Sequence, residues 1–365
     1  MAITLTALAE IIGGRLHNAV DPEMEIRNIG LDSSTLSKKA AIFAAVPGTR
    51  KHGAVFATQD RAAGALAVLT DDEGAGILAE AGGQRPLIVV SEVRKVLGVA
   101  SSSVYGDPSQ ELVLIGVTGT SGKTTTSYLL ERGLMEAGYK VGLIGTTGTR
   151  IDGEAVPTKL TTPEAPTLQK LFYRMRQHDV THVVMEVSSH ALSLGRVSGS
   201  HFDVAAFTNL SQDHLDFHDT MDEYFEAKSL FFHPDSPLAA TNQVVCVDDE
   251  WGTHMAEIAG NAQTVATTGK TADFIATAAQ VSESGEQNFS ITTPEHGDVP
   301  VTLALPGAFN VANATLALAA AVRAGVDPVP FAQGMAKVAV PGRMERIDEG
   351  QDFLAVVDYA HKPAA

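Results

Sequence analysis

The sequence predicts an α/β protein, with a small N-terminal α/β domain followed by a central domain built on a mostly parallel sheet. From Leu112 onward, near-continuous apolar runs alternate with helical stretches, as expected for strands buried on both faces of a parallel sheet covered by helices. The first of these runs leads into a glycine-rich turn and a helix. Between about residues 262 and 306, a partial period-two alternation predicts an antiparallel addition to the sheet.

The composition restricts the class of protein. The 365-residue chain is 44% hydrophobic and 19% charged, so it can bury more than one core. Its formal net charge of −17 argues against a nucleic-acid binder, because such proteins cluster Lys and Arg to displace counterions. The single cysteine, Cys246, excludes an internal disulfide framework and is expected in a buried strand. The sequence shows neither a signal-peptide pattern nor an apolar run of about 18 residues, so we expect a cytoplasmic protein without membrane insertion, and a monomer.

The elements follow in order along the chain. Residues 1–107 alternate short apolar runs with polar turns, and the Gly-Asp-Pro-Ser break at 106–109 marks the end of this predicted first domain. The predicted central domain spans residues 108–343. Two of its helices are expected after the antiparallel addition, beginning near Phe309 and near Asp327. Its predicted parallel strands lie at 112–119, 140–146, 181–187, 202–210 and 242–247.

The turn after the first central strand has the character of a phosphate-binding loop with unusual glycine spacing. Its glycines stand at positions 116, 119 and 122, and Val117 occupies the place of the first glycine in the commonest loop of this kind. Such a turn points backbone N–H groups and the positive end of the next helix at an anion. Lys123 would then reach the outer phosphates, and the Thr124 hydroxyl would ligate Mg²⁺. The alternative is a plain glycine-rich turn without a ligand.

Candidate metal ligands follow two of the later strands. Glu186 ends the apolar run 181–187, where a carboxylate is costly unless it is paired or bound to a metal. A solvent-facing edge residue is the alternative for Glu186. The segment 209–220 follows the next strand and contains Asp213, His214, Asp216 and His218. Their shared position favours a site, while the spacing leaves open which of them are ligands and which are loop residues or turn caps.

A further basic residue lies on a predicted amphipathic helix. Thr220 and Glu223 can form a capping box that opens this helix. Lys228 then falls on the same face as Tyr224 and Phe225. From spacing alone we favour a lysine whose stem packs on apolar neighbours while its ammonium reaches water.

Six segments stand in an order and at distances that resemble a known family. They are “GTSGKTT”, “LTTPEAPTL”, “MEVSSHALSLGRV”, “FTNLSQDHLDFHDTMDEYFEAKSLFF”, “VPGRMERID” and “DYAHKP”. They resemble the Mur ligase family of peptidoglycan synthesis, in particular the members that add a diamino acid to UDP-N-acetylmuramoyl-L-alanyl-D-glutamate. The resemblance covers nearly all of the chain. Because the Rossmann-like third domain of that family is essentially missing, we expect the chain to be a fragment in which residues 344–365 begin that domain.

The resemblance implies ATP and two Mg²⁺ ions as cofactors, and a carbamate on Lys228 that turns its ammonium into an oxygen ligand. Its implied metal ligands are Thr124, Glu186, His214 and Lys228, and its implied catalytic residues are Lys123, Lys228, Glu186 and His214. The implied ATP-binding residues are Gly119, Thr120, Ser121, Gly122, Lys123, Thr124, Thr125, Asn313, Arg343, Asp358 and His361. The implied substrate-binding residues are Leu31, Ser33, Thr49, Arg50, Lys51, Thr161, Thr162, Ser188 and Arg196. Ser121 departs from the asparagine commonest in the family, and residues 49–51 differ from the “HQ” type of some members.

The chemistry implied by the resemblance is an ATP-dependent amide ligation. ATP phosphorylates the D-glutamyl γ-carboxylate, and the amine of the diamino acid attacks the acyl phosphate, with meso-diaminopimelate expected rather than L-lysine. Lys123 and the metal ions would neutralise charge, and Arg196 would steer the substrate carboxylate. Without the third domain, we expect the fragment to bind UDP-substrate and weakly ATP without turnover.

Two other functions stay open. A folylpolyglutamate synthetase would share the loop and the mechanism, but the first domain and the “TTPE” and “SSHAL” segments argue for the muramoyl substrate. A non-catalytic nucleotide-binding module would bind nucleotide without acyl-phosphate chemistry.

Overall fold

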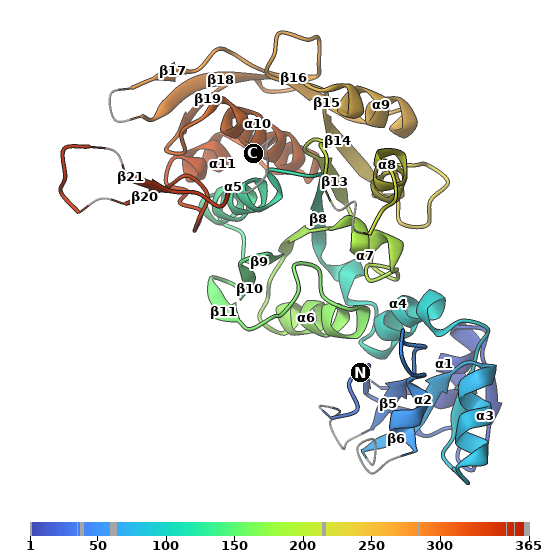
Figure 1. Cartoon of the computed structure of the whole chain (residues 1–365). Helices are drawn as coiled ribbons and strands as arrows, with labels where there is room; N and C mark the ends of the chain where they lie inside the picture. Colours follow the sequence, from blue (N-terminus) through green and yellow to red (C-terminus); the bar gives the residue numbers. More distant parts are fainter. Residues whose placement is uncertain are drawn as a thin grey trace. The chain divides into compact units, whose positions relative to one another are not determined.

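The computed structural model describes residues 2–34, 36, 40–58, 64–213, 217–282, 285–347, 349–353 and 355–360, and its fold is α/β as predicted (Figure 1). The chain forms two compact units. The first is assembled from Met1–Glu111, Pro163–Arg176 and Leu194–Ser200. The second comprises Leu112–Thr162, Gln177–Ser193 and His201–Ala365. The domain limits at residues 107 and 343 stay a prediction.

The first unit is built on a sheet with strand order β2-β7-β6-β5-β4. Neighbouring strands from β4 to β7 are parallel and β2 joins the edge antiparallel, while β1 pairs with β3 separately. Their bounds are β1 Ile3–Thr4, β2 Arg15–His17, β3 Glu25–Ile26, β4 Asn28–Gly30, β5 Ala41–Ala44, β6 Ala65–Thr70 and β7 Leu87–Val89. Successive residues of β5 point to opposite faces, so Ile42 and Ala44 join one apolar cluster and Phe43 joins another.

The helices of the first unit cover both faces of this sheet. Those that contribute to the cluster around Ile42 are α1, α4 and the start of α6, and α2 and α3 contribute to the cluster around Phe43. Side-chain caps start two of them, because Thr4 accepts from the N–H of Ala7 and Asp71 accepts from the N–H of Gly74. The bounds are α1 Leu5–Ile11, α2 Ala54–Ala57, α3 Asp72–Glu80, α4 Val93–Val104 and α6 Ala165–Gln177.

The second unit is built on a 12-stranded sheet within the described part of the chain, and each of the five predicted strand runs contains one of its strands. The strands from β9 to β16 lie in the order β9-β12-β8-β13-β14-β15-β16, and all are parallel to their neighbours. Their bounds are β8 Val113–Thr118, β9 Val141–Gly145, β12 His182–Glu186, β13 Val204–Phe207, β14 Asn242–Cys246, β15 Gln263–Ala266 and β16 Phe274–Ala276.

Antiparallel strands extend this sheet at both edges. The predicted addition between residues 262 and 306 is confirmed for β17 Gln280–Val281, β18 Gln287–Thr293 and β19 Gly297–Leu303. It is wrong for β15 and β16, which continue the parallel order. The hairpin of β10 Gly148–Ile151 and β11 Glu154–Val156 at the other edge was not predicted. A further pair, β20 Glu345–Ile347 and β21 Ala355–Val357, forms a separate sheet.

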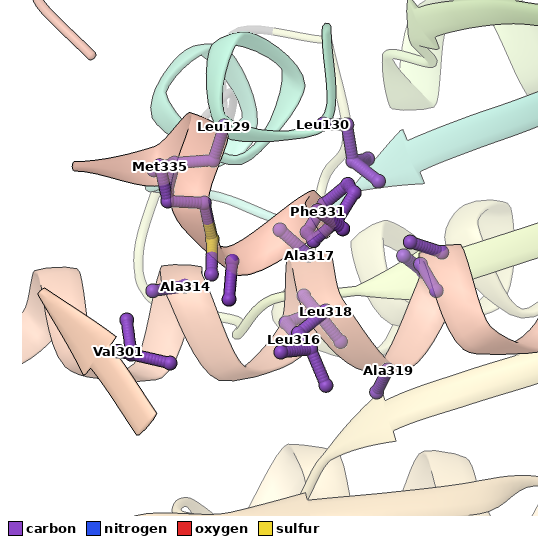
Figure 2. Packing of buried hydrophobic residues seen from close by; sticks show 14 of the residues in the cluster. Leu129, Leu130, Val301, Ala314, Leu316, Ala317, Leu318, Ala319, Phe331 and Met335 are labelled. Atoms are coloured by element: carbon purple, nitrogen blue, oxygen red, sulfur yellow. The ribbon is translucent and has the colours of Figure 1, made fainter. Parts of the chain in front are cut away.

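A helical layer packs against one face of the second unit's sheet. Its helices are α5 Lys123–Glu136, α10 Ala308–Arg323 and α11 Pro328–Met335, so the two helices predicted near Phe309 and Asp327 are confirmed. Figure 2 shows Leu129 and Leu130 of α5 meeting Phe331 and Met335 of α11 above α10. Full burial of a side chain such as Phe331 contributes about 2 kcal/mol. This packing holds α5 against the sheet.

Three further helices, α7 Ser189–Ser193, α8 Met221–Ser229 and α9 Glu250–Ala259, belong to the second unit. The predicted capping box is half confirmed. Thr220 Oγ1 accepts from the N–H of Glu223, but the Glu223 carboxylate accepts from the backbone N–H of Asp219 and not from that of Thr220. Trp251 of α9 lies against Phe225 of α8, with 5.1 Å between ring centroids. Across the described ranges, no helix is long and apolar enough to cross a membrane.

Candidate active site

The loop between β8 and α5 is shaped by two glycines that no other residue could replace without strain. Gly119 has φ 138° and Gly122 has φ 89°, values that side-chain-bearing residues rarely adopt. A Cβ on Gly119 would collide with Thr208 Oγ1, and a Cβ on Gly122 would collide with Asn313 Oδ1. The loop is therefore a close backbone cradle, as a bound phosphate requires.

The residues that follow β13 hold this loop in place. The N–H of Thr120 donates to the Asn209 carbonyl at 2.9 Å, and the N–H of Ser121 donates to Asn209 Oδ1 at 3.0 Å. Thr208 Oγ1 donates to the Ser121 carbonyl at 2.7 Å. Because β13 is the parallel neighbour of β8, its end lies beside the loop. Sequence analysis did not single out Thr208 or Asn209.

The start of α5 presents the groups expected of an anion site. The first bond within the helix runs from the N–H of Thr126 to the Gly122 carbonyl, at 2.8 Å. The N–H groups of Thr124 and Thr125 also lie in this first turn, where an α-helix supplies no acceptor of its own. The Lys123 ammonium folds over the loop and donates to the carbonyls of Gly119 and Thr120, at 2.9 and 2.8 Å. Positive charge and N–H donors thus surround the loop.

Glu186 ends β12 and is 1% exposed, so the solvent-facing alternative for this residue is wrong. Its carboxylate accepts from the Thr124 hydroxyl at 3.2 Å and from the N–H and hydroxyl of Thr146 at 2.9 and 3.0 Å. β12 pairs with β8 in parallel, and Glu186 stands opposite Val117. The sheet register therefore places this carboxylate beside the first turn of α5.

Lys228 is 1% exposed, so the interpretation of its ammonium as reaching water is wrong. Its Nζ donates to the Gly119 carbonyl at 2.9 Å and lies 4.6 Å from the centroid of the Tyr224 ring. The Tyr224 hydroxyl lies 3.2 Å from Thr120 Oγ1. Helix α8 therefore delivers a lysine to the same loop carbonyl that Lys123 contacts.

The remaining metal-ligand candidates are described in part. His214 and Asp216 lie outside the described residues, and so does His361, which was predicted to bind ATP. His218 is buried, and its ring lies 5.2 Å from that of Tyr224. Among residues that the structure describes, no group of three or more His, Cys, Asp and Glu side chains could hold a metal. The described candidates are instead the mixed set of Thr124, Glu186 and Lys228 around the loop.

Three of the predicted substrate residues, Thr161, Thr162 and Ser188, lie close to Glu186. Thr162 Oγ1 donates to the Glu186 carbonyl at 2.8 Å and accepts from the N–H of Ser188 at 3.1 Å. Thr161 Oγ1 lies 3.2 Å from Thr146 Oγ1, which itself donates to the Glu186 carboxylate. Glu186 thus contacts both Thr124, at the end of the β8–α5 loop, and Thr162, in the predicted substrate segment.

Other predicted substrate residues belong to the first unit. Leu31 and Ser33 follow β4 and are half-buried, whereas residues 49–51 are exposed in the turn closed by Pro47 and His52. His52 Nδ1 accepts from the N–H of Ala54 at 3.0 Å, so its Nε2–H donates to Asp71 at 2.9 Å and anchors the turn. Arg196 also lies in this unit and contacts Glu164.

The predicted ATP residues beyond the loop form two groups. Asn313 of α10 lies at the loop, where its Oδ1 accepts from Thr126 Oγ1 at 3.4 Å. Arg343 and Asp358 belong to the region of β20 and β21, where Asp358 accepts from the N–H of Met344 at 2.7 Å and the Arg343 guanidinium lies 4.8 Å from the Tyr359 ring centroid.

Burial shifts the ionisation of three groups in the second unit. It raises the pKa of the Tyr224 hydroxyl beside the loop. It also raises the pKa of the Cys246 thiol to about 12, with Asp248 adding to the effect, and Cys246 is buried in β14 as predicted. Burial lowers the pKa of His182 to about 4 against an opposing effect of Asp203.

Comparison with known proteins agrees with this arrangement. The Mur ligase middle domain matches residues 117–321, and the catalytic domain of the Mur ligase family matches residues 25–105. A UDP-N-acetylmuramoyl-L-alanyl-D-glutamate--2,6-diaminopimelate ligase from Corynebacterium efficiens is 82% identical over 365 residues, which are 100% of this chain and 69% of that protein. The protein of the same name from Corynebacterium glutamicum is 74% identical over 343 residues, 94% of this chain and 66% of that protein.

A solved structure of a ligase with that name is 30% identical and superposes with a TM-score of 0.82, covering 100% of this chain and 72% of that chain. The chain thus spans about two thirds of the length of the relatives it matches. With the middle-domain model matching more than half of its residues and a relative at 82% identity, this chain belongs to the Mur ligase family.

Proposed function

We propose that this chain carries the ATP-binding and UDP-substrate-binding parts of a ligase that joins a diamino acid to the D-glutamyl γ-carboxylate of UDP-N-acetylmuramoyl-L-alanyl-D-glutamate. The relatives at 82% and 74% identity carry that substrate in their names, with 2,6-diaminopimelate as the amino acid. This supports meso-diaminopimelate over L-lysine. We retain the expectation of a cytoplasmic monomer.

The loop from Gly119 to Thr125 is the proposed site of the ATP phosphates. The glycine cradle, the first-turn N–H groups of α5 and the positive end of the helix fit an anion of this size. Rotation of the Lys123 side chain would carry its ammonium from the loop carbonyls to a phosphate oxygen. Asn313, together with Arg343, Asp358 and His361, is proposed to complete the contacts to ATP.

Two Mg²⁺ ions are proposed at the same loop, one on Thr124 and Glu186 and one on His214 and carbamylated Lys228. A hydroxyl and a carboxylate 3.2 Å apart are oxygen donors of the kind that Mg²⁺ prefers. A carbamate on Lys228 would replace a buried ammonium by a bidentate oxygen ligand. When bound, the ions supply charge neutralisation for phosphoryl transfer.

The residues of the chain then act by positioning and electrostatics, and no nucleophilic side chain is needed. Lys123 and the start of α5 stabilise the charge of the transferring phosphoryl group. Thr161, Thr162, Ser188 and Arg196 orient the dipeptide so that its γ-carboxylate oxygen attacks the γ-phosphorus of ATP. The bond from that phosphorus to the bridging oxygen breaks, so ADP leaves and the acyl phosphate remains. The amine of the diamino acid next attacks the acyl carbon, and the new C–N bond forms as the C–O bond to phosphate breaks.

The nucleotide of the substrate is proposed to bind the first unit, through Leu31, Ser33 and the exposed turn of residues 49–51. One observation carries the whole proposal: Glu186 contacts the nucleotide loop through its carboxylate and the substrate segment through its carbonyl. These contacts support the proposal, because a single residue would then link the binding sites of the phosphoryl donor and the acceptor.

Calorimetric titration of the chain with UDP-N-acetylmuramoyl-L-alanyl-D-glutamate tests the proposal, with UDP-N-acetylglucosamine and a folate as controls. We expect saturable binding of the muramoyl dipeptide and weaker binding after Ser33→Ala or Arg196→Ala. Binding of the folate instead would identify a folylpolyglutamate synthetase. Binding of ATP without any acceptor, by a chain shown to be folded, would leave a non-catalytic nucleotide module.

A further inference from the structure

A polar network joins α5 to the hairpin of β9 and β10. The Arg150 guanidinium on β10 donates through Nε to Glu131 Oε1 at 2.8 Å and through Nη2 to Glu131 Oε2. Its Nη1 donates to the Tyr128 hydroxyl at 2.8 Å, and that hydroxyl donates to Thr147 Oγ1 at 2.9 Å. Glu131 and Tyr128 are 3% and 6% exposed. One guanidinium thus holds two buried side chains of α5, and one of these contacts the hairpin turn.

The arginine fixes the direction of the Tyr128 hydrogen bonds. A guanidinium N–H can only donate, so the Tyr128 oxygen accepts from Arg150 and its own proton is left for Thr147. The Arg150 guanidinium also lies 4.3 Å from the centroid of the Tyr128 ring, and the Glu131 carboxylate holds it by a bidentate contact. The Tyr128 hydroxyl is therefore a fixed donor to the turn between β9 and β10.

This turn consists of Thr146 and Thr147, with a glycine on each side. Gly148 has φ 104°, and a Cβ on Gly145 would collide with Glu186 Oε1. Glycines restrain a backbone less than other residues do, and both threonines are exposed, so packing around the turn is sparse. The position of the turn therefore depends on the side-chain contacts of its two threonines.

Both threonines are connected to the same face of α5. Thr124 and Tyr128 lie one turn apart on this helix. Thr124 donates to the Glu186 carboxylate at 3.2 Å, and that carboxylate accepts from the N–H and hydroxyl of Thr146. Tyr128 donates to Thr147, the next residue along the chain. Two routes thus connect the start of α5 to adjacent residues of the turn, and one of them runs through Glu186.

We propose that Tyr128 is a positioning residue for the Mg²⁺ site at Glu186. By holding Thr147, its hydroxyl keeps Thr146 where the N–H and hydroxyl of that residue meet the Glu186 carboxylate. The carboxylate then keeps the orientation in which it faces Thr124, and an oriented ligand binds a metal ion more tightly. This inference rests on the proposed function, because Thr124 and Glu186 are there the ligands of one Mg²⁺ ion.

The test measures ATP binding by calorimetry on the 365-residue chain, once with Mg²⁺ and once with EDTA. We expect Tyr128→Phe to weaken binding of ATP with Mg²⁺ about fivefold, equivalent to about 1 kcal/mol. Binding of ATP in EDTA should stay within about twofold, because the loop N–H groups meet the phosphates without a metal. A hydroxyl that only stabilises the fold would not produce this difference.

The acceptor of the Tyr128 hydroxyl supplies an independent set of variants. Thr147→Val removes the acceptor with little change of shape and should match Tyr128→Phe in both conditions. Thr147→Ser keeps a hydroxyl and should retain most of the affinity for ATP with Mg²⁺. The double variant of Tyr128→Phe and Thr147→Val should lose no more than either single variant, because both remove the same hydrogen bond.

Tyr105→Phe is the matched control. Tyr105 is also 6% exposed, and its hydroxyl donates to a side chain, Asn28 Oδ1, at 2.6 Å in the first unit. Its affinity for ATP should equal that of the wild-type chain in both conditions.

Three results overturn the inference: equal weakening by Tyr128→Phe with Mg²⁺ and with EDTA, unchanged affinity in both conditions, or additive losses in the double variant. Each of them leaves the proposed function standing if the wild-type chain binds ATP. A wild-type chain that is folded by circular dichroism and binds no ATP refutes the proposed nucleotide site itself. Thr147→Val supplies the same comparison if Tyr128→Phe does not fold.

Discussion

Replacing Gly122 by alanine tests whether the proposed phosphate-binding loop, Gly119 to Thr125, needs a glycine at this position for its shape and for ATP binding. The backbone there has φ 89°, and an alanine in this left-handed region costs about 1–2 kcal/mol. The added Cβ also meets Asn313 Oδ1. Asn313 is 7% exposed, and its side chain is held by Thr126 and Asn310.

Moving Asn313 aside breaks at least one of these hydrogen bonds, which costs about 1 kcal/mol. Together with the backbone strain, we expect Gly122→Ala to lower the free energy of unfolding by about 3 kcal/mol. For a unit of this size the melting temperature falls by about 2–4 °C per kcal/mol, so the loss is about 6–12 °C. Binding of ATP with Mg²⁺ should weaken more than tenfold, because both the loop and Asn313 are displaced.

Gly138→Ala is the matched control for this experiment. Gly138 has φ 93°, close to the value at Gly122, but a Cβ added there meets nothing within 4 Å. Alanine at this position therefore carries the backbone strain without the collision. We expect it to lower the free energy of unfolding by about 1–2 kcal/mol and to leave ATP binding unchanged. Thermal unfolding followed by circular dichroism and calorimetric titration with ATP measure both quantities. Equal effects of the two substitutions would refute the assignment of a steric role to Asn313.

Four further outcomes are expected. Glu186→Gln keeps an acceptor for the Thr146 N–H but loses its charge, so Mg²⁺-dependent ATP binding should weaken at least about tenfold in calorimetry with little change in melting temperature. As pH falls from about 6.5 to about 4, His182 takes up a proton in the unfolded chain but stays neutral in the folded one. The free energy of unfolding, measured with urea, should therefore decline across this interval. The His182→Gln substitution should flatten that decline. Arg150→Met leaves Glu131, which is 3% exposed, without its arginine and should cost about 3–5 kcal/mol in urea unfolding, part of which Glu131→Gln should restore. The buried Cys246 thiol should react with a thiol reagent only as fast as the protein opens, so its labelling rate should rise with urea concentration.

The strands that carry the site were predictable because their residues are buried on both sides. Runs such as 112–119 and 181–187 are almost continuously apolar, which is typical of strands in a parallel sheet. The end of the second run also placed Glu186 at a strand end. The order of strands in the sheet leaves no mark in the local sequence. Thr208 and Asn209 were missed for this reason, because they reach the loop only through the pairing of β8 with β13.

Depth of burial was the other quantity that spacing did not supply. The helical period places Lys228 on the apolar face of α8. It does not show how deeply the side chain is buried or whether its ammonium reaches water. Only the folded chain shows that the Gly119 carbonyl lies within reach of its ammonium. The β10–β11 hairpin, by contrast, carried a signal that could have found it, because Asp152 and Gly153 form a turn with φ 51° and 82°.

The contact between Trp251 and Phe225 has a practical consequence. The sequence contains one tryptophan, so the indole emission of the whole chain arises at the contact between α8 and α9. The helix on one side of that contact carries Lys228. Ligand-driven shifts of this helix can therefore be followed in the unlabelled protein as a change in intrinsic fluorescence, while events confined to the first unit leave the emission unchanged.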